Sequence, residues 1–133
     1  MPRQTTEAFF DCPPEKVWRA VTEPSLWGWR SDLRRVRSTR DGRQLITQDE
    51  DGVATVFRIT AFAPYRWYAA ELESRDAEGS CQALFFAEEG GTRVEFTADI
   101  HGKTAKQKLL LRLQLGKRQR RYIEDLKREL GVS

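Results

Sequence analysis

Cysteine and histidine are scarce in this chain of 133 residues, which has two Cys and one His. Cys12 and Cys81 form no CxxC pair and His101 is the only imidazole, so the ligand sets of zinc and iron–sulfur sites are missing. We therefore expect no metal site and no cofactor. The two cysteines are expected to be small core residues, as is usual for free Cys in a cytosolic protein.

Long hydrophobic runs are lacking as well. No apolar stretch approaches the ~20 residues that a membrane-spanning helix needs, and residues 1–12 lack the apolar segment of a signal peptide. Hydrophobic residues make up 39% of the chain and charged residues 32%, as in soluble globular proteins. These features predict one cytoplasmic domain that spans residues 1–133 and has no transmembrane segment.

Recognisable catalytic motifs are also absent. The sequence has no Ser/His/Asp set and no GxSxG nucleophile motif. His101 stands where the last predicted strand gives way to a helix, which is typical of a surface or capping residue. We therefore nominate no catalytic residue from motifs alone.

Turn signals follow one another at regular spacing and indicate an antiparallel sheet. Asp41-Gly42 and Asp51-Gly52 are hairpin signatures, and further turns are expected at residues 64–66, 77–79 and 90–91. Alternation is clearest near the end of this region, where Val94 and Phe96 face one way and Arg93 and Glu95 the other. The predicted strands are residues 3–10, 33–40, 43–50, 53–62, 67–74, 80–88 and 92–101.

Two short helices and one long helix complete the pattern. A short helix begins near Pro13-Pro14 and ends at Glu23-Pro24, and a second short piece spans residues 25–29. Residues 103–130 predict one long C-terminal helix. The order predicts an α+β fold, in which a curved sheet of about seven strands wraps around the long helix.

Three stretches of the chain resemble a known family: CPPEKVWRAVTEPSLWGW, GGTRVEF and YIEDLKREL. With the order of elements, they are similar to the START-like (SRPBCC, helix-grip) superfamily, in its bacterial polyketide cyclase/dehydrase-like branch. The resemblance implies an apolar cavity between the sheet and the long helix. Relatives hold lipids, sterols, polyketides, quinones or plant hormones there.

The long helix carries unusual residues on its expected inward face. The apolar members of this face are Leu109, Leu113, Ile123, Leu126 and Leu130. Arg112, Gly116 and Gln119 fall among them. Arg112 would anchor an anionic group of a ligand and Gln119 a carbonyl or hydroxyl, while Gly116 would leave space or permit a bend. The alternative is a rotated or kinked helix, with Arg112 reaching the rim.

Aromatic side chains are expected to line the cavity, because rings suit a planar or ring-containing ligand. We predict the wall residues from the alternation of side chains along each strand and from their positions in the chain. They are Trp29, Phe57, Phe85 and Phe96.

Charge is distributed unevenly, since residues 103–130 carry ten Lys or Arg and three acids. We expect the basic face of Lys106, Lys117, Arg118, Arg121 and Arg128 to be mainly exposed to solvent. An alternative is weak contact of this face with an anionic partner, such as a membrane or ribosome.

The leading hypothesis is a protein that binds a small hydrophobic ligand, such as a lipid, polyketide, quinone or aromatic metabolite, without catalysis. The first alternative is a cyclase or aromatase-type enzyme that positions its substrate with Arg112, Tyr68 and Tyr122. The second is a ribosome- or membrane-associated interaction protein. The sequence leaves the ligand open, and it does not decide whether the protein is a homodimer.

Overall fold

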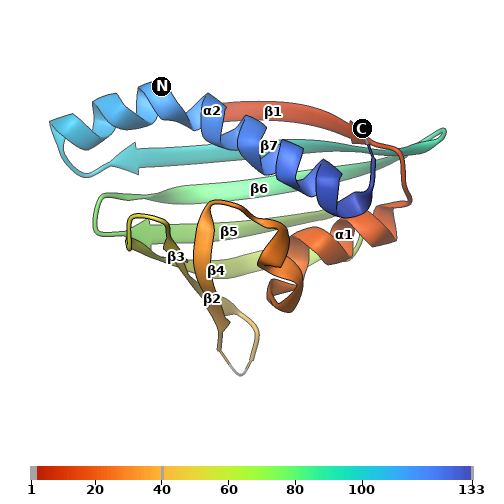
Figure 1. Ribbon diagram of the computed structural model, residues 1–133, viewed down its shortest axis with the longest axis horizontal. Helices are drawn as coiled ribbons and strands as arrows, with labels where there is room; N and C mark the ends of the chain where they lie inside the picture. The colour runs from red at the N-terminus through yellow and green to blue at the C-terminus, as the bar shows by residue number, and fades with distance from the viewer. Residues whose placement is uncertain (1–2, 40, 133) are drawn as a thin grey trace.

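Seven antiparallel strands and one long helix dominate the computed structural model, which describes residues 3–39 and 41–132 (Figure 1). The elements are β1 (Arg3–Phe10), α1 (Pro14–Thr22), the 3-10 helix η1 (Pro24–Trp29), β2 (Leu33–Ser38), β3 (Gln44–Asp49), β4 (Ala54–Ala63), β5 (Trp67–Ser74), β6 (Ala77–Glu88), β7 (Gly91–Gly102) and α2 (Ala105–Leu130). The strand order is β1-β7-β6-β5-β4-β3-β2. The predicted α+β helix-grip architecture, with two short helices between the first two strands, is confirmed.

Most strand bounds agree with the prediction to within a few residues, but the turn expected at residues 77–79 is wrong. Gly79 lies inside β6, paired with Leu72 on one side and Ile100 on the other. A Cβ at Gly79 would lie 2.1 Å from the backbone oxygen of Asp99, so the glycine permits close strand contact and does not mark a turn. The turn is instead made by residues 74–77, where the Ser74 hydroxyl accepts hydrogen bonds from the backbone of Asp76 and Ala77.

Local signals explain where the two α-helices begin and end. Pro14 opens α1 and Glu15 lies in its first turn. The Thr104 side chain accepts a hydrogen bond from the backbone N–H of Gln107, which caps α2 and places its start two residues after the predicted 103. Gly131, with a φ of 72°, ends α2 in the left-handed conformation that glycine favours.

The close-packed core lies at one end of the sheet. It is formed by α1, the second half of α2 and the strands β1, β6 and β7. The largest fully buried side chains include Phe10, Leu126, Val17, Val21 and Val94. Burying a side chain of this size stabilises the folded state by about 1.5–3 kcal/mol. The core therefore fixes α2 over β1 and β7, as Figure 1 shows.

The inward face predicted for the first half of α2 is wrong. Leu109 and Leu113 are 56% and 70% exposed, whereas Leu111 and Leu115 are buried. Leucines at 109, 110, 111, 113 and 115 cover every side of this helical segment, so their pattern fits more than one rotation. Leu115 and Leu111 lie close to whole helical turns before the buried Leu126, so the three side chains share one face of α2. This face packs on the sheet.

Gly116 does not interrupt α2, because the helix runs without a break from Ala105 to Leu130. A Cβ at Gly116 would meet Arg120 Nη1 at 3.7 Å and Gln4 Nε2 at 3.8 Å, which is ordinary contact. We expect Gly116→Ala to raise the free energy of unfolding by about 0.5–1 kcal/mol, since alanine is the better helix former. Urea denaturation measures the change. A loss of stability would show that this helical turn needs the glycine.

Candidate functional site

The ligand-binding residues predicted on α2 do not come together on the inner face of the sheet. Arg112 is exposed to solvent, so the inward position predicted for it is wrong. Gln119 binds the edge strand β1, because its Oε1 accepts a hydrogen bond from the Thr6 hydroxyl and its Nε2 donates to the Gln4 carbonyl oxygen at 3.2 Å. Arg112, Gly116 and Gln119 therefore form no common site.

The four predicted aromatic residues do lie on the helix-facing side of the fold, but in different surroundings. Phe85 and Phe96 are buried members of the core. Trp29 packs edge-on against Tyr122 with ring centroids 5.2 Å apart, and its indole N–H donates to the Ala20 carbonyl oxygen. Phe57 of β4 stays partly exposed and is paired with Leu72 of β5.

A group of residues that the sequence did not bring together lies beside Trp29. The Arg30 guanidinium lies over the rings of Trp27 and Tyr122, with 5.2 and 5.1 Å between its central carbon and the ring centroids. It also donates two hydrogen bonds to the Asp32 carboxylate, at 2.9 and 3.2 Å. Cation–π contacts of this kind are stronger where water is excluded, and the Arg30 side chain is only 15% exposed.

Two tyrosines and a cysteine face the same region. Burial raises the pKa of Tyr122 to about 12, although the nearby Arg30 charge lowers it in part. Burial also raises the pKa of Tyr68 well above its usual value, and Tyr122 raises it further. The pKa of Cys81 is raised to about 11, again chiefly by burial. At neutral pH the phenols and the thiol are therefore protonated, and none of them is a ready base or nucleophile.

We call Arg30, Tyr68, Cys81 and Tyr122 the inner cluster. Arg30 and Tyr122 come from the end of η1 and from α2, and Tyr68 and Cys81 from β5 and β6. Tyr68 is tilted against Phe85, and Tyr122 packs edge-on against Phe96 at 5.3 Å. Although burial dominates their pKa values, Tyr68, Cys81 and Tyr122 all keep some accessible surface.

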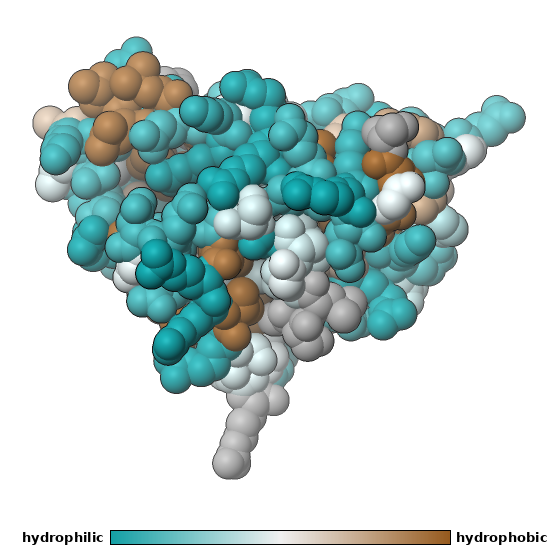
Figure 2. Space-filling model, viewed as in Figure 1, coloured by the Kyte–Doolittle hydropathy of each residue, from teal (hydrophilic) through white to brown (hydrophobic). Residues whose placement is uncertain are grey.

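The inner face of the sheet is only partly covered by α2, whose contacts with the sheet are chiefly with β1 and β7. On β4 and β5 the inward-facing Phe57, Ile59 and Leu72 are partly accessible. Figure 2 shows apolar side chains between the polar surface of α2 and the lower strands. The apolar face thus continues from the inner cluster toward β3, without the dense packing found under α1.

Two hollows of the surface lie elsewhere. One of about 600 Å³ is lined by β2, β3 and β4, including Arg35, Arg37 and Ile46. A smaller hollow of about 180 Å³ lies on strands β5, β6 and β7 and includes Gln82 and Thr97 on the outer side of the sheet. Neither of them lies between α2 and the sheet, where the sequence predicted a ligand cavity.

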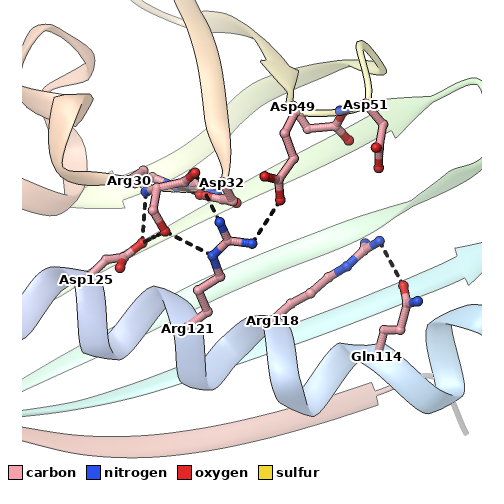
Figure 3. Close-up of polar contacts among 10 residues, drawn as sticks. Arg30, Asp32, Asp49, Asp51, Gln114, Arg118, Arg121 and Asp125 are labelled. Atoms are coloured by element: carbon pink, nitrogen blue, oxygen red, sulfur yellow. Dashed lines mark hydrogen bonds and ion pairs between the residues drawn. The ribbon is translucent and has the colours of Figure 1, made fainter.

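A polar network joins α2 to the segment that follows η1 and to the β3–β4 turn (Figure 3). The buried Asp125 carboxylate accepts hydrogen bonds from the Ser31 backbone at 2.9 Å and the Ser31 hydroxyl at 2.6 Å, and it pairs with Arg128. Arg121 donates to the Ser31 hydroxyl and pairs with Glu50, both at 2.9 Å.

The basic face predicted on α2 is exposed, as expected, at Lys106, Lys117, Arg118, Arg121 and Arg128. Arg121 and Arg128 nevertheless belong to the polar network and are not merely solvated. Within the described residues no helix is long and apolar enough to cross a membrane. The same residues contain no group of three or more His, Cys, Asp or Glu that could hold a metal ion.

Solved structures with the same fold come from several bacteria. A START superfamily protein from Mycobacterium smegmatis superposes with a TM-score of 0.83 at 12% identity, covering 97% of each chain. The XoxI protein of Bacillus cereus gives 0.74 at 20% identity, covering 98% of this chain and 93% of its own. DynU16, from the dynemicin biosynthetic locus, gives 0.76 at 15% identity and is covered over 48% of its length.

At these identities the structural likeness establishes a START-like fold and nothing finer. No curated protein matches the chain. A family model, however, matches residues 1–131, which is almost the whole sequence. Since that match agrees with the observed order of strands and helices, the chain belongs to the polyketide cyclase/dehydrase and lipid transport family.

Proposed function

We propose that this protein binds a small apolar ligand with one polar end, on the inner face of the sheet, and does not transform it. The observation that carries the proposal is the inner cluster, a set of hydrogen-bonding groups with aromatic neighbours, next to the partly accessible apolar face of β4 and β5. Ligand sites combine in this way a mostly apolar wall with a few polar groups that fix orientation. Membership of a family with lipid transport proteins supports the same class of ligand.

The polar end of the ligand is expected to be a neutral hydroxyl or carbonyl. Asp32 already binds Arg30 through two hydrogen bonds, so much of the guanidinium charge is neutralised within the protein. The hydroxyls of Tyr68 and Tyr122 are protonated at neutral pH and can donate to a carbonyl oxygen or accept from a hydroxyl. Trp29 and Phe57 remain in the proposal as wall residues, with Phe85 and Phe96 behind them.

Absence of catalysis is proposed because the cluster offers no group that titrates near neutral pH. General acid–base catalysis works best with a pKa close to the working pH, and Tyr122 at about 12 and Cys81 at about 11 are far from it.

Filling the apolar face tests the proposal. We expect Leu72→Trp to weaken binding of 1-dodecanol or 2-naphthol by at least about tenfold, because the larger ring occupies space next to Phe57. Isothermal titration calorimetry measures the affinity, and circular dichroism checks the fold.

Glu73→Trp is the matched control, because Glu73 is the next residue of β5 and faces the other side of the sheet, exposed to solvent. It should bind both probes as the wild-type protein does. If neither probe binds the wild-type protein, or if Leu72→Trp binds as tightly as Glu73→Trp, the inner face is not the ligand site.

A further inference from the structure

An apolar pair stands on the outer side of α2, away from the inner cluster. Leu109 and Leu113 are 56% and 70% exposed and lie one helical turn apart. Figure 2 shows a large hydrophobic group at the end of the molecule that contains the start of α2. Two adjacent leucines so far from the core contribute little to folding, so their exposure calls for another explanation.

Basic residues border this pair along the helix. Lys106, Lys117 and Arg120 follow the same face at spacings of three or four residues from the leucines or from one another, and all three are exposed. No ion pair is found for any of the three within the described part of the chain. The first acid of the helix is Glu124, several turns away from Leu109.

We propose that this outer face of α2, made of Lys106, Leu109, Leu113, Lys117 and Arg120, docks on an anionic lipid surface. Leucines on such a face enter the boundary between headgroups and acyl chains, while the basic side chains contact lipid phosphates. Each Lys or Arg close to an anionic membrane adds to the attraction. The docking is peripheral, and it is independent of whether the inner cluster binds a ligand.

The charges on this face of α2 favour an anionic bilayer over two other candidate partners, a second copy of the chain and a nucleic acid. A second copy of the chain, placed symmetrically on the same face, would bring basic residues of one copy close to basic residues of the other, and this repulsion opposes pairing of the leucines. A nucleic acid would use the cations but would leave Leu109 and Leu113 without apolar partners. An anionic bilayer accommodates both kinds of side chain.

Vesicle co-sedimentation at low salt tests the proposal. The wild-type protein should bind vesicles of phosphatidylcholine mixed with phosphatidylglycerol and should not bind vesicles of phosphatidylcholine alone. Leu109→Ser with Leu113→Ser should weaken binding by at least about tenfold, and Lys106→Glu with Lys117→Glu should weaken it at least as much. Both pairs are exposed, so circular dichroism should show an unchanged fold.

Arg35→Glu with Arg37→Glu is the matched control, because it makes the same change of charge at exposed positions on β2. This variant should bind the mixed vesicles as the wild-type protein does. Absence of binding to the mixed vesicles, equal loss in the control, or full binding by the double serine variant would each overturn the proposal. A dimer that the serine variant abolishes, or binding to RNA in place of vesicles, would overturn it in favour of those partners.

Discussion

Leu126→Ala is expected to lower the free energy of unfolding by about 3 kcal/mol, one of the two largest losses that we predict for a single substitution. The Leu126 side chain is fully buried between α1, β1 and β7 in the core. Truncating such a leucine removes its transfer free energy and leaves a cavity that the neighbours fill only in part, at a typical cost of about 2–5 kcal/mol. Urea or thermal denaturation followed by circular dichroism measures the loss.

Leu113→Ala is the natural control, because it makes the same chemical change on the same helix at a side chain that is 70% exposed. Its effect should stay within about 0.5 kcal/mol of zero. Similar losses in the two variants would mean that the rotation of α2 on the sheet differs from the one described here.

Asp125→Ala is expected to cost about 2–3 kcal/mol. The carboxylate accepts two hydrogen bonds from Ser31, and hydrogen bonds to a charged group are each worth about 1.5–3 kcal/mol. Alanine would also leave the Ser31 backbone N–H without its acceptor, unless water replaces it. Denaturation of the variant at neutral pH measures the loss, and Glu124→Ala, at an exposed neighbouring position, should change stability by less than about 0.5 kcal/mol.

The contribution of Asp125 should also depend on pH. Burial tends to raise the pKa of this carboxyl, but the hydrogen bonds from Ser31 and the charges of Arg128 and Arg121 outweigh it and lower the pKa below its usual value. A lowered pKa in the folded state means that the stabilisation is complete above the unfolded-state value and is lost as the pH falls through the folded-state value. The stability gap between the wild-type protein and Asp125→Ala should therefore narrow in acid. A gap that is constant down to acid pH would contradict this role for the carboxylate.

The sequence was informative where the structure depends on short-range signals. Asp41-Gly42 and Asp51-Gly52 predicted turns correctly, and both glycines have positive φ, at 71° and 81°. The proline pair at the start of α1 and the glycine after α2 likewise act within a few residues. Gly79 was misleading because it does not mark a turn. Its lack of a side chain lets the backbone of β7 lie close to β6, and such contacts between strands cannot be read from a local sequence pattern.

The rotation of α2 and the inner cluster depend on contacts between distant residues. Five leucines in the first half of the helix made its inward face ambiguous, and packing on β1 and β7 selected Leu111 and Leu115. The sequence did name Tyr68 and Tyr122, as residues that would position a substrate in the enzyme alternative. Nothing in the pattern around Arg30, however, indicates that its guanidinium lies on the Tyr122 ring.

Helix α2 is attached to the rest of the fold by two different kinds of interaction, apolar packing on one side and the polar network around Ser31 on the other. On one side the helix is held by an apolar core under β1 and β7, and on the other by Arg121, which reaches Glu50 in the β3–β4 turn. Added salt screens the exposed ion pair but leaves the hydrophobic packing intact. Ionic strength therefore acts selectively on the contact between Arg121 and Glu50, whereas the buried hydrogen bonds between Asp125 and Ser31 and the apolar core are little affected.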